Sequence, residues 1–323
     1  MIIAFASTNI YLEVCTSNSD RKEPYMKFFL LAVLFSVLLF SSVSFSQIGV
    51  NVNSLPVFET KEYVKPVSTW FGTYFNSGIY YDASVPDIFG FKFNLIGMWT
   101  IIPENQKTYK PNPRLPDVEN VDPTATVFGN KASYYLGSKG FYTYPSGLSL
   151  NAVPSVIYQF AASTYNTELL LRFFPRVKFG DTKVGILGLG IKHEISSYIP
   201  MLPVDIAVQI LYNNFNFEFN DGDPVNYTKL KSHNFAFNVH ASKTFAGMFI
   251  VYSGLQYESS SMDFSYYFED KNNYYPATGN KIQNLSVDGD NNFRFTLGGA
   301  VKLGVFVVNA DLNLTTLTTF TTG

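Results

Sequence analysis

Strict alternation of apolar and polar residues is the feature that most constrains how this chain can fold. In HNFAFNVHAS (233–242), Phe235 and Phe237 share one parity, and Asn238 and His240 share the other. Successive side chains of an extended strand point to opposite faces. The stretch therefore predicts a β-strand with one apolar and one polar face, and each face needs its own environment.

The same alternation recurs along the chain, in strands longer than globular domains usually contain. Further stretches with this pattern are Phe89 to Thr100, Asn166 to Phe174, Gly185 to Ile195, Val204 to Asn213, Phe293 to Leu303 and Val305 to Leu314. Globular strands average about 5–6 residues, whereas a membrane-spanning strand needs about 9–11. No convincing helical period is found after residue 46. These patterns predict an all-β fold.

Two environments fit the apolar face: a second sheet, as in a secreted or periplasmic β-protein, or lipid. Only 15% of the residues are charged and 17% are aromatic, and the polar face includes small residues such as Gly188 and Gly190 that suit a crowded interior. The favoured interpretation is a closed antiparallel transmembrane β-barrel, because closure pairs the backbone amides that lipid cannot. About 12 strands are expected, with 10 to 14 possible.

The connections also predict a barrel. Short connections are expected at 163–165, 199–203 and 243–247, and long polar loops at 214–232 and 259–292. Short periplasmic turns and long outer loops are typical of outer-membrane barrels.

Parity then divides the residues between the two faces. The polar residues expected to face the lumen are Lys92, Asn94, Glu168, Arg172, Lys192, Glu194, Asp205, Gln209, Asn234, Asn238, His240, Arg294, Lys302, Asn309 and Asp311. The apolar residues expected to face lipid are Phe91, Phe93, Leu169, Leu171, Leu189, Ile191, Ile206, Val208, Ile210, Phe235, Phe237, Val239, Phe295, Leu297, Phe306 and Val308. Because the lumen charges have mixed signs, ion pairs across the lumen are expected rather than a selectivity ring.

The N-terminus predicts export to the bacterial outer membrane. Met26-Lys27 precedes the apolar run 28–40 and the small residues Ser44 and Ser46, which together resemble a cleaved signal peptide. We expect a non-native upstream extension at 1–25, a signal peptide at 26–46, an N-terminal segment at 47–66 that could form a small plug, and a barrel at 67–323. The last strand looks incomplete at the C-terminus.

Candidate chemistry is sparse. His240 and Ser242 lie two apart on the lumen face, a spacing that weakly resembles the His and Ser of outer-membrane acyl hydrolases. A polar His near a turn explains the same residues without catalysis, so no enzyme is predicted. No metal ligand set or phosphate-binding Gly loop is found, and no cofactor is expected.

Several stretches resemble a family of uncharacterised bacterial outer-membrane β-barrel proteins, a domain of unknown function. They are NTELLLRFFP (166–175), GLGIKHEISSYIPMLPVDIAVQ (188–209) and LGVFVVNADLNL (303–314). The resemblance covers most of residues 63–323. The layout is also distantly similar to the long-chain fatty-acid transporter barrels, which implies uptake of hydrophobic small molecules past an N-terminal plug.

The leading functional hypothesis is therefore a passive channel or transporter for a small solute, with a hydrophobic solute as one case. The alternative is a structural or surface-display barrel with a plugged lumen, and an outer-membrane acyl hydrolase is third. Expected partners are outer-membrane lipid, the hydrophobic solute and the outer-membrane assembly machinery. No basic stripe suggests nucleic acid.

Overall fold

The computed structural model describes residues 48, 51–115, 118, 121–271 and 273–323. All of these residues belong to the second of two units, which begins at Ser42. The expected upstream extension at 1–25 and the signal peptide at 26–46 lie outside the described residues.

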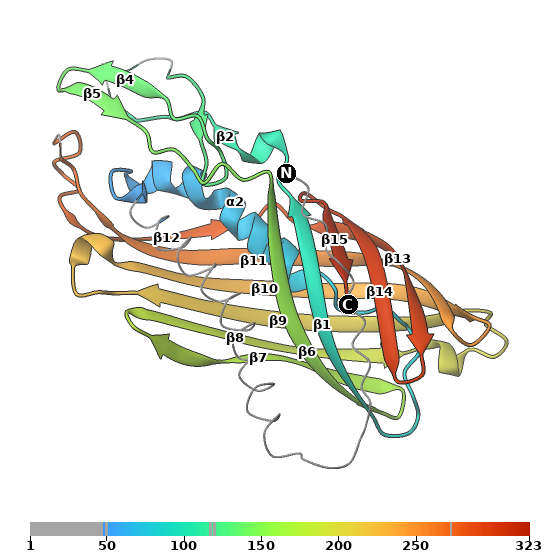
Figure 1. The fold of residues 1–323 in the computed structure, drawn as a ribbon. Coiled ribbons are helices and arrows are strands. Elements are labelled where there is room, and N and C mark those ends of the chain that lie inside the picture. The colour runs from blue at the N-terminus through green and yellow to red at the C-terminus, as the bar shows by residue number, and fades with distance from the viewer. Residues whose placement is uncertain (1–47, 49–50, 116–117, 119–120, 272) are drawn as a thin grey trace, which may run out of the picture. The chain divides into compact units, whose positions relative to one another are not determined.

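Eleven antiparallel strands form one sheet whose hydrogen bonds run in a ring (Figure 1). The order is β10-β9-β8-β7-β6-β1-β15-β14-β13-β11-β12, and β10 also pairs with β11. The ring passes through ten of these strands, because β12 pairs only with β11. The ten strands of the ring and the eleven of the sheet both fall within the expected range of 10 to 14 and below the favoured number of 12.

The bounds of the sheet strands are β1 Gly90–Ile101, β6 Ala152–Thr164, β7 Thr167–Phe179, β8 Thr182–Glu194, β9 Asp205–Phe219, β10 Thr228–Phe245, β11 Phe249–Phe268, β12 Lys281–Asp288, β13 Phe293–Leu303, β14 Phe306–Leu314 and β15 Thr319–Thr322. Two small hairpins pair β2 Thr108–Tyr109 with β3 Thr124–Ala125 and β4 Tyr134–Gly137 with β5 Gly140–Thr143. Single turns of 3-10 helix occupy Glu104–Gln106, Ser196–Tyr198 and Pro224–Asn226.

The expectation that the chain has no helix is wrong, because α2 covers Val57–Asn76. Pro66 lies inside it, so the boundary expected between 66 and 67 falls within one element. Most of its residues are buried on every side, and its side chains and carbonyls contact strands around the ring, from β6 to β13. The helix is therefore enclosed by the sheet. Within the described residues, no helix is long and apolar enough to cross a membrane.

The two ends of the ring differ, although less strictly than expected. At the end we call the turn end, short turns join β6 to β7, β10 to β11 and β13 to β14. The opposite, loop end carries the connections 102–151, 220–227 and 269–280. Gly180 and Asp181 alone join β7 to β8 at this loop end. The loops expected at 214–232 and 259–292 are present but shorter, at 220–227 and 269–280, because β9, β10, β11 and β12 extend far into the expected ranges.

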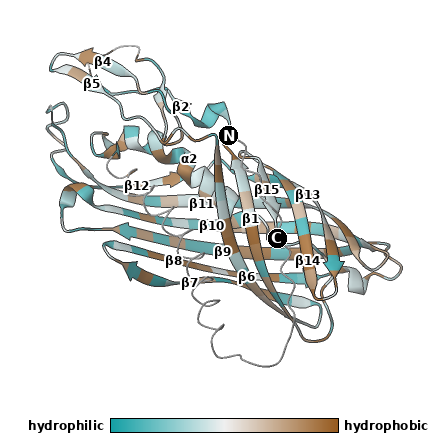
Figure 2. Ribbon diagram, viewed as in Figure 1, coloured by the Kyte–Doolittle hydropathy of each residue, from teal (hydrophilic) through white to brown (hydrophobic). Residues whose placement is uncertain are grey.

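The sequence pattern missed these extensions because the apolar residues change from the outer face to the inner face along each strand. Near the turn end of β11, Val251 and Leu255 are exposed and Gln256 is buried; nearer the loop end, Asp263 is exposed and Phe264 is buried. The register of β10 with β9 and β11 continues without a break. Figure 2 shows that hydrophobic and hydrophilic residues both occur along these strands. The sheet therefore has an apolar outer face toward the turn end and an apolar inner face toward the loop end.

Candidate functional site

The inside of the ring is occupied by one continuous stretch, residues 57–85, which we call the inner segment. It consists of α2 and the extended residues that follow it. Its helix starts among the loop-end connections, where Glu59 accepts a hydrogen bond from the backbone N–H of Asn112 (2.7 Å). Its far end reaches the turn end, where Val85 N donates to Glu194 (2.5 Å). The segment thus runs along the length of the ring.

Arg172 of β7 binds the C-terminal end of α2. Its guanidinium donates to the carbonyl oxygens of Phe75 (2.7 Å) and Ser77 (3.1 Å) and to the Gln159 side chain (3.0 Å). The last carbonyls of a helix lack partners within the helix and carry partial negative charge. Arg172 is fully buried, and the end of the helix takes the place of a carboxylate partner.

Arg294 of β13 binds the same end of the helix from another side of the ring. It donates to Thr73 O (3.2 Å) and forms an ion pair with Glu258 of β11 at 3.0 Å, with both side chains almost fully buried. It also contacts the Ser77 hydroxyl. A buried ion pair is stable only when its remaining hydrogen-bonding groups are satisfied. The helix end supplies acceptors for the remaining N–H groups of Arg294.

Neutral amides complete this attachment. Asn213 donates to Phe75 O (3.0 Å), and Gln256 donates to Asn76 O (3.1 Å). Together with the two arginines they come from β7, β9, β11 and β13. We call these four wall residues, Arg172, Asn213, Gln256 and Arg294, the helix seat.

Asp82 fixes the extended half of the inner segment near the turn end. Its carboxylate lies 2.9 Å from Lys302 Nζ and accepts a hydrogen bond from Ser242 (2.9 Å). Its carbonyl accepts from Lys192 (3.1 Å). Strands β8, β10 and β13 therefore all hold this one residue.

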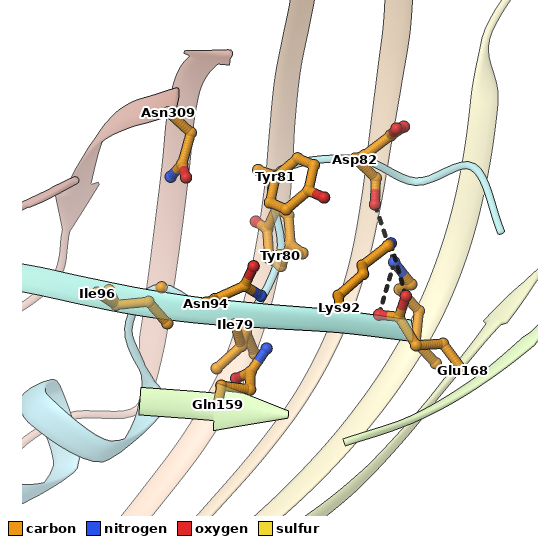
Figure 3. A pocket seen from close by; sticks show the side chains of 12 residues that line it. Ile79, Tyr80, Tyr81, Asp82, Lys92, Asn94, Ile96, Gln159, Glu168 and Asn309 are labelled. Atoms are coloured by element: carbon orange, nitrogen blue, oxygen red, sulfur yellow. Dashed lines mark hydrogen bonds and ion pairs between the residues drawn. The ribbon is translucent and has the colours of Figure 1, made fainter. Parts of the chain in front are cut away.

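Lys192 also belongs to a three-residue ion cluster beside the inner segment (Figure 3). Glu168 lies 2.6 Å from Lys92 Nζ and 3.1 Å from Lys192 Nζ. These side chains line a cavity of about 10 Å³, which has room for about one water molecule. The expected ion pairs thus include strand-to-strand contacts, but Arg172 and Lys302 pair with the inner segment instead.

His240 and Ser242 do not contact each other as a nucleophile and base would. Ser242 donates to Asp82, as described above, and His240 Nδ1 lies 2.7 Å from the Asn238 side chain. The His240 ring stacks on Tyr80, with ring centroids 3.9 Å apart. Gly254 makes room for this stack, since a Cβ there would lie 2.3 Å from the Tyr80 hydroxyl. These contacts hold the inner segment in place.

The residues assigned by parity lie as follows. On the inner face Lys92, Asn94, Asp205 and Lys302 are half-buried, and the buried ones are Glu168, Arg172, Lys192, Glu194, Gln209, Asn234, Asn238, His240, Arg294, Asn309 and Asp311. On the outer face Ile206, Val208 and Phe235 are half-exposed, and the exposed ones are Phe91, Phe93, Leu169, Leu171, Leu189, Ile191, Ile210, Phe237, Val239, Phe295, Leu297, Phe306 and Val308. That lipid covers the outer set stays a prediction.

The sequence analysis missed the residues through which the inner segment is held, above all Tyr80, Asp82 and Glu258. Glu258 follows the alternation of β11 and could have been found by extending that strand. Tyr80 and Asp82 lie in a stretch without regular structure, and no local pattern marks them. Among the described residues, no three His, Cys, Asp or Glu side chains gather as a metal site.

Comparison with known sequences identifies the family. Residues 25–323 match the family of unknown function DUF6588. The chain belongs to this family. No curated protein matches this DUF6588 chain.

Among solved structures, the likeness is weak. A multiply substituted mutant of the Rh. blastica porin has 9% sequence identity and a TM-score of 0.14, over 72% of this DUF6588 chain and 98% of the porin. A structure described as "Asymmetric conductivity of engineered proteins" has 8% identity and a TM-score of 0.13, with the same coverage. TM-scores this low carry no argument about fold, and the distant similarity to fatty-acid transporters stays a prediction.

Proposed function

We propose that residues 47–323 form an outer-membrane β-barrel whose lumen is plugged by its own inner segment. The observation that carries this proposal is the attachment of that segment to strands on several sides of the ring. The cavity described beside it has a volume of about 10 Å³. In this form the barrel does not conduct. Its role is then structural, or the display of its loop-end connections at the cell surface.

The apolar outer face supports membrane insertion. On β10 it runs from Phe235 to Phe245, which is about 33 Å of strand at 3.3 Å per residue. A tilt of about 40° reduces this to about 25 Å, the height of the apolar band in outer-membrane barrels. Lys243 interrupts this face close to the turn end, where a long cationic side chain can reach the headgroups.

The loop end supports an orientation. Outer-membrane barrels carry their longer loops outside and their shorter turns in the periplasm. Connection 102–151 is by far the longest in the described chain and lies at the loop end. We therefore orient the loop end outward and the turn end toward the periplasm.

Gated passage of a hydrophobic solute is the second candidate. It is favoured by an apolar cluster where the inner segment meets the wall, formed by Ile79, Tyr80, Leu211, Ala236, Ile250 and Tyr252. A solute could pass there only after the inner segment moves. Both proposals predict a closed resting state, and only the second predicts uptake.

Planar-bilayer recording and liposome uptake test these proposals. The wild-type protein is expected to give no steady ion current, because the lumen is filled. The variant N213A/Q256A removes two hydrogen bonds of the helix seat and should give transient openings. Asn216→Ala, which lies on the outer parity of β9, is the matched control and should stay closed.

Three outcomes separate the alternatives. A steady wild-type current would refute the plugged barrel. Uptake of fatty acids or aromatic hydrocarbons into liposomes by the wild-type protein would favour gated transport over a structural role. Purified protein that stays a dispersed monomer without detergent would refute membrane insertion altogether.

A further inference from the structure

A basic groove lies on the outer wall at the loop end of β7 to β10. It has a volume of about 250 Å³ and is lined by Arg176, Lys183, Asn216, Phe217, Glu218, Lys229, Leu230 and Lys231. Four cationic side chains thus surround one carboxylate. The protein as a whole has a formal net charge of −2, so this local excess of positive charge does not reflect its composition.

The strand register places these charges in a continuous row. Lys178 lies opposite Lys183 in the β7–β8 pair, and Lys183 lies opposite Glu218 in the β8–β9 pair. Glu218 in turn lies opposite Lys229 in the β9–β10 pair. Like charges opposite each other on neighbouring strands are destabilising. Glu218 is the ion-pair partner of Lys183, so this row holds three lysines and one carboxylate.

The carboxylate in the groove neutralises only part of this charge. Glu218 forms an ion pair with Lys183 at 2.8 Å and interacts electrostatically with Lys229 and Arg176. Within the described residues, no carboxylate lies within ion-pair distance of Arg176, Lys229 or Lys231. Three cations therefore remain available to a ligand.

A β-bulge brings Arg176 into the groove. The register between β7 and β8 shifts between Phe174 and Val177, and such a bulge redirects the side chains beside it. The neighbouring position on β8 is Gly185, where an added Cβ would lie 3.0 Å from the Arg176 Cα. A side chain at position 185 would therefore crowd the backbone of residue 176, and glycine on β8 leaves room for the bulge.

The groove directly adjoins the apolar outer face. Phe173 and Leu187 face each other on β7 and β8 and are both exposed, and the groove begins within three residues of Phe173 along β7. A step of one residue is about 3.3 Å. If the apolar face lies in hydrocarbon, the groove lies at the level of the lipid headgroups.

From this position and charge we infer that the groove binds the phosphate groups of an anionic lipid in the surrounding outer leaflet. The inference rests on the proposed membrane insertion and orientation. Clustered Lys and Arg side chains at the headgroup level attract anionic lipid, and arginine can hold a phosphate through two parallel hydrogen bonds. Loop-end orientation makes the partner a phosphorylated outer-leaflet lipid such as lipid A.

The test uses the detergent-purified full-length protein and native mass spectrometry to count bound lipid. The variant R176Q/K183Q/K229Q/K231Q removes the four groove cations. The control variant K61Q/K110Q/K131Q/K281Q removes four exposed lysines outside the groove. The probes are lipid A, dephosphorylated lipid A and inorganic phosphate.

We expect lipid A to bind the wild-type protein and the control variant equally. The groove variant should lose about fivefold in affinity for each of the three unpaired cations that it removes. Dephosphorylated lipid A should bind weakly to all three proteins. Equal lipid A binding by groove and control variants would overturn the inference. Binding of inorganic phosphate as tightly as lipid A would also overturn it, since the ligand would then be a free anion.

Flotation with neutral phosphatidylcholine liposomes separates this inference from the proposed function. If all three proteins float with the liposomes but lipid A binding does not depend on the groove, only the inference fails. If none floats, membrane insertion fails, and the inference fails with it.

Discussion

Arg172 carries a buried positive charge for which no described carboxylate lies within ion-pair distance; its partners are helix carbonyls and one glutamine. Substitution by Met keeps an unbranched apolar stem but removes the guanidinium. The Ser77 carbonyl then loses its Arg172 donor, and the Phe75 carbonyl keeps only the donor from Asn213. Each orphaned buried group costs about 1–3 kcal/mol.

We therefore predict that R172M lowers the free energy of unfolding by about 3 kcal/mol, measured by urea unfolding in detergent. Arg176→Met is the matched control, because Arg176 lies on the same strand with its side chain on the outer face. This substitution should change stability by less than about 0.5 kcal/mol. A stable R172M would mean that the buried charge costs more than its hydrogen bonds contribute.

Glu59 lies in the first turn of α2, outside the strands, and its side chain is buried. Burial raises the pKa of its carboxyl above the usual 4.5, although the hydrogen bond from Asn112 N–H acts in the opposite direction. The folded state therefore holds a proton that the unfolded state releases. Stability falls as the pH rises from about 4.5 through the raised pKa.

Thermal unfolding between about pH 4 and pH 7 checks this prediction. The wild-type Tm should decline over this range, and E59Q should show a smaller decline because it has no proton to lose. Glu62→Gln, an exposed neighbour on the same helix, removes only the smallest of the effects that raise the pKa of Glu59 and should show nearly the wild-type decline. An E59Q curve parallel to the wild-type curve would contradict the assignment.

At the scale of the element, β11 shows most clearly how one strand meets two environments. Leu255 and Ser261 lie on its same outer face, six residues apart, but Leu255 lies in the apolar part and Ser261 beyond it. A charged residue facing lipid near the bilayer midplane costs about 2–4 kcal/mol, falling to about 0–1 near the interface.

Leu255→Arg should therefore destabilise the protein in lipid vesicles by about 2–4 kcal/mol, whereas Ser261→Arg should cost no more than about 1 kcal/mol. Urea unfolding in vesicles measures both. Equal costs for the two variants would mean that the outer face of β11 meets a single solvent.

The same exchange of faces explains which elements the sequence predicted. Where the outer face stays apolar, the prediction was nearly complete: β13 has the bounds expected from alternation, Phe293–Leu303. In β9 the outer face changes to Asn214, Asn216 and Glu218 while Phe217 turns inward, so a pattern that expects one apolar parity ends too early and predicts a loop.

Helix α2 was missed for a different reason. A helix shows its period through one apolar and one polar side, but α2 is buried almost all round and so has no polar side to reveal it. Pro66 in its interior also argues against a helix in sequence. The helix seat could not be predicted, because its partners are backbone carbonyls of an element that the pattern did not show.

At the scale of the whole molecule, one of the two tryptophans lies inside the ring and the other lies on its outer face. Trp70 lies on α2 and is 9% exposed, whereas Trp99 lies on the outer face of β1 and is 53% exposed. In liposomes with brominated acyl chains, the fluorescence of W70F, which keeps Trp99, should be strongly quenched. W99F, which keeps Trp70, should be quenched little.

Comparable quenching of the two variants would contradict either the enclosure of α2 or the contact of the outer face with lipid. Unbrominated liposomes provide the control for changes in fluorescence caused by insertion alone.

Enclosure of α2 also constrains the order of assembly. A helix surrounded by an unbroken circuit of paired strands cannot enter sideways through the finished wall, and it precedes every strand of that circuit in the chain. Arg172 and Arg294 meet their carbonyl partners only when this helix is present. We therefore expect the strands to assemble around α2, which acts as a template, and the ring to close last.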